Sequence, residues 1–230
     1  MYKRQLQLIA TEDGSYTLYD PALEESYHSK FGAKTESDQV FLHNAGVHNR
    51  LSSGKPTSVL EIGFGTGFNF VHTSQIAIET NCTLNYTALE LNPLPPDLIL
   101  DLLQKNAIDK NLSQFTADAL GSIKTSDTTS NTSFNPIVKL ELINSDANHW
   151  RFPADQYDAI YLDAFSSKNN PLLWQHTFLT SLRQSLLDDG TLATYQVNRR
   201  FRDALTEAGW NWRKLPGPKG KREVLIATKT

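Results

Sequence analysis

The sequence predicts an α/β fold whose centre is a mostly parallel, seven-stranded sheet with one antiparallel strand. From residue 57 onward, apolar runs typical of strands alternate with helix-like segments, and this alternation produces parallel strands. A glycine-rich turn separates the first of these strands from the first helix, which is typical of nucleotide-binding α/β units. The last two strands form a hairpin, so one strand of the sheet is antiparallel.

Composition indicates a soluble globular protein. The chain has 230 residues, of which 39% are hydrophobic and 20% charged, which is enough for a sizeable core. No run of 18 apolar residues occurs, and Met1–Arg4 is not followed by a secretory apolar segment. The single cysteine, Cys82, excludes an internal disulfide and fits a reducing compartment. We therefore expect a cytoplasmic protein without a membrane partner.

Charge is distributed unevenly along the chain. Residues 199–230 hold nine basic and three acidic residues, a net charge of +6, whereas the rest carries −9. A basic end on an acidic body could face a polyanion such as a nucleic acid. A solvated surface explains the same charges equally well.

The first part of the chain predicts an extension that precedes the nucleotide-binding unit. Gln5–Ile9 and Ser15–Tyr19 alternate apolar and polar residues around an Asp-Gly turn, which indicates a β-hairpin. Thr35 or Ser37 could cap a helix that continues to about Leu51. We expect this extension, a hairpin with helices, to occupy residues 1–55, and the main domain to occupy 56–230.

The glycine-rich turn holds the first functional motif. Gly63, Gly65 and Gly67 follow the strand Thr57–Ile62 with spacings of two and two, whereas dinucleotide binding requires another glycine where Phe68 stands. This disfavours an NAD-dependent dehydrogenase. The pattern resembles motif I of class I S-adenosylmethionine (SAM) methyltransferases, in a Rossmann-like fold. An acid at the strand end, two residues before the first glycine, suits the cationic ammonium and sulfonium of SAM.

Three further strands also end in acids. Glu90 follows Leu84–Leu89, Asp146 follows Ile137–Ile143, and Asp163 ends the next strand. Ligands on parallel sheets bind beyond the carboxyl ends of the strands, so we expect these acids to surround SAM. Glu90 would accept the ribose hydroxyls, with a plain surface acid as the alternative. Asp146 would accept the adenine amino group or cap a helix, and one aspartate could do both. The predicted cofactor-binding residues are Glu61, Gly63, Phe64, Gly65, Gly67, Asn69, Glu90, Asp146 and Ala147.

The remaining segments complete the predicted order of elements. Residues 111–136 are rich in Ser, Thr and Asn without an apolar pattern, which predicts an insertion that is flexible over about 121–136. The other predicted elements are helices at 97–105, 172–187 and 200–208, and strands at 191–196, 210–215 and 223–228. His43 and His48 are five residues apart with no completing cysteine or carboxylate pair, so no metal site is predicted.

Several longer segments resemble one family. The N-terminal matches are Asp13–Tyr19 and Tyr27–Ser29, and those of the core include Glu61–Phe70, Leu162–Pro171 and Gly217–Leu225. These segments resemble the methyltransferase domain of MnmC, in its stand-alone, MnmD-like form. The resemblance covers nearly the whole chain outside the Ser/Thr-rich insertion.

The resemblance implies an activity and a partner. Members of this family transfer a methyl group from SAM to the 5-aminomethyl group of wobble uridine 34 in tRNA, forming 5-methylaminomethyl-2-thiouridine. It implies binding to the tRNA anticodon arm without a metal, and it is compatible with a separate oxidase acting in trans. Asp163 is the expected catalytic residue, which would orient the amine and accept or relay a proton, with a loop cap as the alternative. The predicted substrate-binding residues are Tyr27, Phe165, Lys168, Lys219, Lys221 and Arg222.

Two other functions remain open at this point. A polyamine-type aminopropyltransferase shares the fold and also has an aspartate at the end of the fourth strand. A non-catalytic RNA-binding module on a methyltransferase fold is the second alternative. The intact Glu61, Glu90 and Asp163 argue against it.

Overall fold

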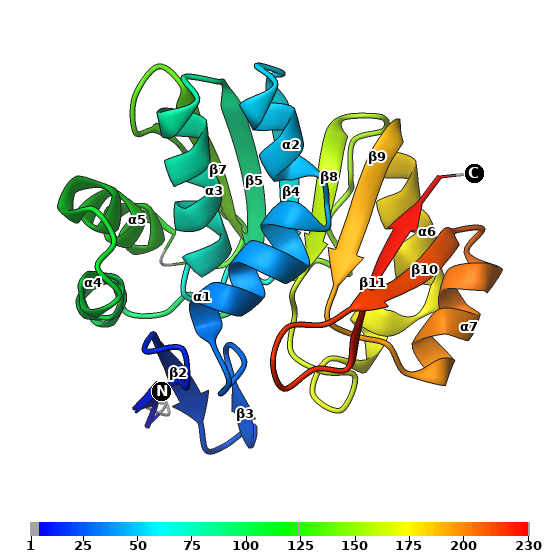
Figure 1. The fold of residues 1–230 in the computed structure, drawn as a ribbon, viewed down its shortest axis with the longest axis horizontal. Coiled ribbons are helices and arrows are strands. Elements are labelled where there is room, and N and C mark those ends of the chain that lie inside the picture. Colours follow the sequence, from blue (N-terminus) through cyan, green and yellow to red (C-terminus); the bar gives the residue numbers. More distant parts are fainter. Residues whose placement is uncertain (1–4, 124, 230) are drawn as a thin grey trace.

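The computed structural model describes residues 5–123 and 125–229, which form one large and one small sheet (Figure 1). The first four residues of the predicted extension, Lys124 in the predicted insertion and Thr230 lie outside the described part. The small sheet contains β1 (Gln7–Ala10), β2 (Tyr16–Asp20) and β3 (Glu25–Ser26). The large sheet has the order β10-β11-β9-β8-β4-β5-β7-β6. Its strands are β4 (Thr57–Ile62), β5 (Leu84–Glu90), β6 (Thr128–Ser133), β7 (Val138–Asn144), β8 (Tyr157–Leu162), β9 (Leu186–Thr194), β10 (Asn211–Pro216) and β11 (Glu223–Thr228).

The predicted mostly parallel sheet is confirmed. β4 pairs in parallel with both β5 and β8, β5 pairs with β7, and β8 pairs with β9. β11 runs antiparallel between β9 and β10, as the predicted terminal hairpin requires. Every residue of β8 is buried, which explains why this central strand is apolar along its whole length apart from Asp158, rather than alternating.

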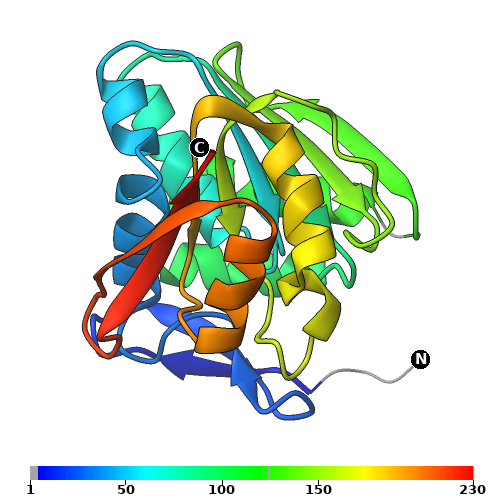
Figure 2. The ribbon, with the colours of Figure 1, turned by 90° about the vertical axis from the view of Figure 1, so that its right-hand side faces the viewer.

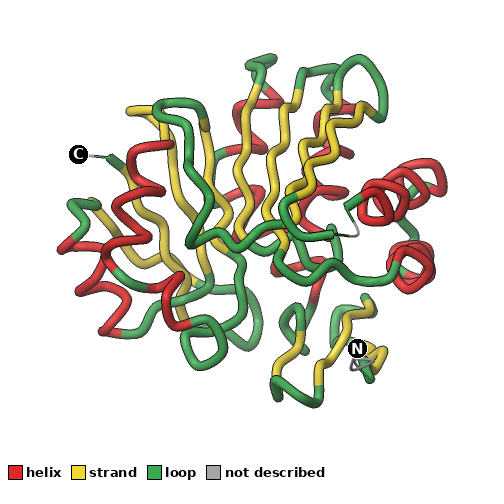
Figure 3. Tube along the Cα trace, turned by 180° about the vertical axis from the view of Figure 1, so that it is seen from behind, coloured by secondary structure: helices red, strands yellow, loops and turns green. Residues whose placement is uncertain are grey.

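Helices cover both faces of the large sheet (Figures 2 and 3). α2 (Val47–Ser52) and α3 (Phe68–Glu79) lie on one face, together with the segment before them, and α6 (His176–Ser185) and α7 (Arg199–Glu207) lie on the other. Successive residues of β4 belong to the two cores, since Val59 is part of the same apolar cluster as Phe70, whereas Leu60 is part of the cluster that contains Leu179. Among the described residues, no helix has the length and apolar character needed to cross a bilayer.

The small N-terminal sheet lies at the carboxyl ends of the parallel strands (Figures 1 and 2). Its predicted hairpin is confirmed, because β1 pairs antiparallel with β2. Asp13 in the hairpin turn accepts hydrogen bonds from the Thr35 amide and hydroxyl, at 3.0 and 2.8 Å. These bonds attach the hairpin to the first helix, so the small sheet covers the edge at which ligands bind in α/β folds.

The predicted capped helix after the hairpin differs from the structure. It divides into α1 (Ala33–Glu36), a π-helical segment η1 (Ser37–His43) and α2, and Gly46, with φ +77°, separates the last two. Neither predicted cap acts as one, because the Thr35 hydroxyl donates to Asp13 and the Ser37 hydroxyl donates to Asn69. Tertiary partners have replaced the local capping bonds.

The predicted irregular insertion is the other correction. α4 (Pro96–Lys105) is followed by α5 (Lys110–Ser122), whose N-cap Asp109 accepts hydrogen bonds from two backbone amides of its first turn. Strand β6 then pairs antiparallel with β7 over six residues as an eighth, edge strand. A polar segment forms a strand here because the β7 edge supplies backbone partners whatever the side chains are.

Candidate functional site

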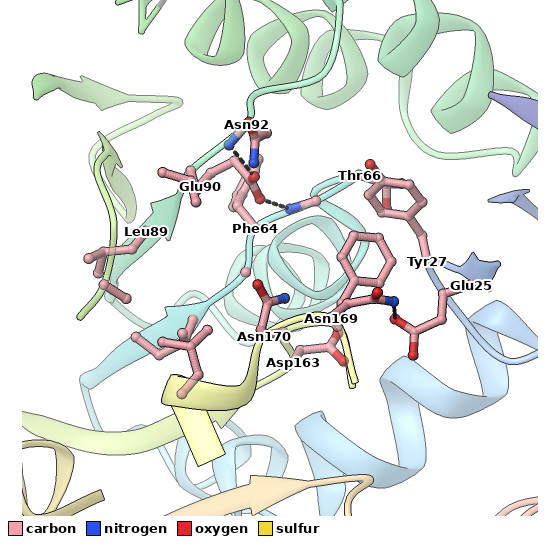
Figure 4. Close-up of a pocket in the computed structure, with 18 of the residues that line it drawn as sticks. Glu25, Tyr27, Phe64, Thr66, Leu89, Glu90, Asn92, Asp163, Asn169 and Asn170 are labelled. Carbon is pink, nitrogen blue, oxygen red and sulfur yellow. Dashed lines mark hydrogen bonds between the residues drawn. The ribbon is translucent and has the colours of Figure 1, made fainter. Parts of the chain in front are cut away.

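One cavity of about 580 Å³ opens where the carboxyl ends of β4, β5, β7 and β8 meet the small sheet (Figure 4). This volume falls within the range of roughly 300–1,000 Å³ that is usual for small-molecule sites. Most of the residues predicted from the sequence lie on its wall. They are Tyr27, Gly63, Phe64, Gly65, Asn69, Glu90, Asp146, Ala147, Asp163, Phe165 and Lys221.

The glycine loop approaches its neighbours too closely for side chains. Gly63 has φ +91°, and an added Cβ would lie 3.0 Å from the carbonyl oxygen of Asp163. At Gly65, with φ +53°, it would lie 3.1 Å from the Tyr27 ring. Gly67 packs against Thr116 and Phe64 and does not line the cavity. Two glycines therefore let the backbone form the cavity wall, and the third positions the helix behind it.

Two of the acids that end or follow strands accept hydrogen bonds from nearby residues. Glu90 accepts hydrogen bonds from the amides of Gly65 and Asn92, both at 2.8 Å (Figure 4). Asp146 accepts from the amide and the side chain of Asn148, at 2.9 and 2.8 Å. The alternative of a helix cap at Asp146 is wrong, since the residues after it form a turn rather than a helix.

Asp163 belongs to a hydrogen-bonded group at the end of the cavity. The Asn69 side-chain amide donates to Asp163 Oδ2 at 2.8 Å and to Glu61 Oε1 at 2.7 Å. Burial, followed by the charge of Glu36, raises the pKa of Asp163 well above its usual value. Glu61 was predicted to hold the cofactor directly, but it is 1% exposed and lies behind the cavity wall.

The wall near Asp163 includes an ion pair from the two ends of the chain. Lys221, in the turn between β10 and β11, pairs with Glu36 of α1. The Lys221 ammonium also lies 4.2 Å from the ring centroid of Tyr195, and the Tyr195 hydroxyl donates to Ala164 O at 2.8 Å. Lys221 was predicted as a surface contact for phosphate, but its charge is neutralised inside the site. The Lys221 ammonium would therefore act on a molecule bound inside the cavity instead of on a phosphate at the surface.

The same turn is packed tightly against the N-terminal segment. Gly220 has φ +83°, and a Cβ there would fall 1.8 Å from a ring atom of Phe31. Gln39 donates to the carbonyl oxygen of Pro216 at 3.3 Å, and Lys219 pairs with Glu12 at 2.8 Å. We call these contacts, with the Lys221–Glu36 pair, the chain-end seam.

Three predicted substrate contacts lie on the surface rather than on the cavity wall. Lys168 pairs with Glu24 at 2.7 Å, and both side chains are about 70% exposed. Lys219 pairs with Glu12 in the chain-end seam, and Arg222 is exposed. The predicted substrate contacts Tyr27 and Phe165 both line the cavity, and their rings meet edge to face with centroids 5.0 Å apart. Within the described residues, no group of three or more His, Cys, Asp or Glu side chains is arranged to hold a metal.

Sequence reasoning missed several polar residues on the cavity wall. Asn169 donates to Glu25 at 2.9 Å, which joins the loop after β8 to β3 (Figure 4). Neither residue is an acid that directly follows one of the predicted strands, so only the resemblance of Leu162–Pro171 to the family marked the loop of Asn169. The missed polar residues are Glu25, His28, Glu36, Asn169, Asn170 and Tyr195.

His28 is expected to make the stability of the fold depend on pH. It is 8% exposed, and its ring nitrogens lie 2.8 and 3.3 Å from the hydroxyls of Thr17 and Thr66. Burial lowers its pKa from 6.5 to about 4, so below pH 6.5 the unfolded chain binds more protons than the folded chain. Stability should therefore fall as the pH drops from 6.5 towards 4. Between pH 7 and pH 5 this residue should account for about 2 kcal/mol of that loss.

Urea unfolding of the wild type and of His28→Gln at the two pH values measures this contribution. The variant should lose less stability than the wild type between pH 7 and pH 5. His149→Gln is the matched control, because the His149 side chain is 83% exposed. Equal losses in the wild type and in His28→Gln would contradict the assignment.

Comparison with known proteins identifies the class of this site. Residues 106–230 match the family model described as "S-adenosyl-L-methionine-dependent methyltransferase", and the chain belongs to this family. It is also similar to the "tRNA 5-methylaminomethyl-2-thiouridine biosynthesis bifunctional protein MnmC" of Burkholderia thailandensis, with 31% identity over 95% of the chain and 34% of that protein. MnmC of Paraburkholderia phymatum is 29% identical over 91% of the chain and 33% of that protein. The chain thus spans about a third of the length of these relatives.

A solved structure shares the fold. The crystal structure of MNMC2 from Aquifex aeolicus superposes with a TM-score of 0.77 at 21% identity, covering 98% of this chain and 71% of that one. The predicted methyltransferase fold, the resemblance to MnmC and SAM as the cofactor are confirmed. The family match favours methyl transfer over the aminopropyltransferase and non-catalytic alternatives.

Proposed function

We propose that the chain transfers the methyl group of SAM to the 5-aminomethyl group of (2-thio)uridine at the tRNA wobble position, forming 5-methylaminomethyl-2-thiouridine. The observation that carries this proposal is the arrangement of the cavity, in which Asp163 lies beside the glycine loop and the rings of Tyr27 and Phe165 form part of the same wall. The names of the similar MnmC proteins support the choice of substrate.

The cofactor fits the side of the cavity formed by the glycine loop. Gly63 and Gly65 form a wall that a Cβ would disrupt, and this allows close approach of the methionine part of SAM. Glu90 keeps unused lone pairs after accepting two amide bonds, so it can also accept the ribose hydroxyls. Asp146, Ala147 and Phe64 line the same cavity, and we assign the first two to the adenine base and Phe64 to the side formed by the glycine loop.

The chemistry is a direct displacement. Bound SAM supplies a methyl group on a cationic sulfur that is already a good leaving group. A neutral amine nitrogen forms the new N–C bond as the C–S bond breaks, and the amine then loses a proton. Because alignment is the main requirement, holding the amine in line contributes most to the rate.

Asp163 is the residue we assign to the amine. A free alkylamine is mostly protonated near pH 7, and an ionised carboxylate beside it favours that ammonium form. A carboxyl whose pKa is raised, as that of Asp163 is, matches proton acceptance from the amine better than an ordinary surface aspartate. We therefore propose that Asp163 orients the nitrogen and takes the proton that the amine releases.

The opening of the cavity would receive the nucleotide. Tyr27 and Phe165 are placed to stack on a uracil ring turned out of the anticodon loop. Lys168 and Lys219 form exposed ion pairs, which contribute little stability, so these lysines can exchange carboxylates for phosphates. Arg222 is exposed outside the cavity and would contact the phosphate backbone of the tRNA, like the two lysines. Lys221 is left out of this group because it faces Glu36 inside the site.

The cellular setting follows from the substrate. We propose a cytoplasmic enzyme in which residues 1–55 form an extension that closes the site of a methyltransferase domain at 56–230. An oxidase that acts in trans is compatible with this reaction as the source of the amine.

Purified protein incubated with labelled SAM and tRNA from cells lacking this activity tests the proposal. The label should enter tRNA and appear, after nucleoside digestion, as the 5-methylaminomethyl derivative of wobble uridine. Free polyamines and tRNA already carrying the methyl group are the controls, and neither should become labelled. Label in a polyamine, or in another nucleoside, would contradict the proposed substrate.

A further inference from the structure

The Asn69 side chain joins two carboxyl groups that have different access to the cavity. It is 4% exposed, and its amide nitrogen donates one hydrogen to Glu61 and the other to Asp163. The Ser37 hydroxyl donates to its amide oxygen, so both ends of the amide are satisfied. The reversed amide would place its oxygen against both carboxyl groups, and this fixes the orientation.

The two carboxyl groups lie at different depths. Asp163 lines the cavity, whereas Glu61 is enclosed and accepts a second hydrogen bond from the Tyr86 hydroxyl at 3.0 Å. A ligand in the cavity can therefore touch Asp163 but reaches Glu61 only through Asp163 and Asn69. From this position Glu61 cannot contact a cofactor in the cavity directly.

We propose that Asn69 is a positioning residue that ties Glu61 and Asp163 into one acid pair, with Asp163 presented to the substrate and Glu61 held behind it. This rests on the proposed function for the identity of the substrate, an amine. It assigns Glu61 to the substrate end of the site instead of the cofactor. The pair itself is a property of the protein alone, so it can be tested without tRNA.

Charges around the pair favour one proton for its two carboxyl groups together. Burial and the charge of Asp163 raise the pKa of Glu61, which Asn69 and Tyr86 oppose through hydrogen bonds. Beyond the pair, Glu36 of α1 raises the pKa of Asp163 and Lys221 lowers it. The other titratable groups that face the pair are Glu90 and the hydroxyls of Tyr86, Tyr161 and Tyr195.

Two acids that interact through one donor titrate as a pair rather than separately. Glu61 is the more enclosed of the two carboxyl groups, so the proton of the pair stays on Glu61 to higher pH. Asp163 is then the member that ionises first, and it is the member that lines the cavity. It can orient an amine while its neighbour stays neutral, which avoids placing two negative charges behind a group that must lose a proton.

Carbon-13 NMR titration of protein labelled at the aspartate carboxyl carbons tests the proposal, with Asp163→Asn identifying the Asp163 signal. In the wild type this signal should show two steps, one for each member of the pair. In Glu61→Gln the second step should vanish, and the first should stay or move to lower pH. In Asn69→Ala the loss of the donor should move the Asp163 step up by about one pH unit.

Controls separate a positioning role from a merely structural one. Ser37→Ala keeps Asn69 but removes the bond that orients it, so it should give a smaller upward shift, and it serves if Asn69→Ala does not fold. Asn144→Ala is the matched control, because Asn144 is 5% exposed and donates at 2.8 Å to a backbone carbonyl away from the cavity. It should lower stability and leave the Asp163 step in place.

Two results would overturn the proposal. One is an Asp163 step that is unchanged in both Asn69→Ala and Ser37→Ala, and the other is an equal upward shift in Asn69→Ala and Glu61→Gln. Neither result depends on which RNA the enzyme modifies. If tRNA is not the substrate but the titrations behave as expected, the proposed function fails and the acid pair stands.

Discussion

Replacing Asp163 by asparagine is expected to slow methyl transfer by about 100-fold or more, as is usual when a positioned acid–base group is lost. An amide of the same shape can still accept a hydrogen bond from Asn69, so the cavity should keep its form. It cannot take a proton from the amine. The loss should therefore appear in kcat, while the affinity for SAM changes by about threefold at most, because Asp163 lies at the amine end of the cavity.

Single-turnover methylation of tRNA with labelled SAM measures the rate, and calorimetry measures SAM binding. Asp101→Asn is the matched control, since Asp101 is an aspartate of α4 with a 60% exposed side chain. It should leave both quantities unchanged. Near-normal turnover by Asp163→Asn would show that another group, or water alone, accepts the proton.

Replacing Gly63 by alanine is expected to destabilise the fold by about 3 kcal/mol and to abolish SAM binding. The residue has φ +91°, where a side chain is strained, and the new Cβ would lie 3.0 Å from Asp163 O and 3.1 Å from Ala164 Cα. Both contacts are with backbone, which cannot rotate away as a flexible side chain can. Relief requires the end of β4 to move away from the end of β8, which opens the cavity wall.

Gly54→Ala provides a matched control. Gly54 also has a left-handed backbone, with φ +74°, but no atom lies within 4 Å of the position of an added Cβ. Gly54→Ala should lose only the stability that a side chain costs in a left-handed conformation, about 1–2 kcal/mol, and should keep SAM binding. Urea unfolding and calorimetry of both variants separate the two effects. Equal losses would show that the close approach at Gly63 does not matter.

The parallel core could be predicted because its signals are local. β4, β5 and β8 are apolar runs that end in acids, and the acids converge because parallel strands end at the same edge. α5 was missed because its polar residues resemble a loop. In the structure the hydroxyls of Ser113 and Thr116 donate to backbone carbonyls four residues earlier, at 2.9 and 2.8 Å. Because these bonds satisfy the hydroxyls, both side chains can be buried on a helix.

The site was predictable only where its residues follow a strand. Glu36 and Tyr195 reach the cavity through tertiary packing, and nothing near them in the sequence indicates a ligand. Lys221 was placed on the surface because a basic turn between two strands is usually solvated. Its partner Glu36 lies 185 residues earlier in the chain. No pattern within one segment reports such a pairing.

The chain-end seam also constrains the order in which the enzyme matures. The turn that carries Lys221 is synthesised 185 residues after Glu36, with which it pairs, and also long after Phe31, against which it packs. Long-range contacts of this kind form late in folding, because a long loop must close first. A nascent chain that has not yet made β10 and β11 has the glycine loop and the strand-end acids but lacks Lys221, which pairs with Glu36 on the cavity wall. The charge of Glu36 beside Asp163 is therefore balanced only after Lys221 has been synthesised, so the acidic part of the site is completed later than the glycine loop.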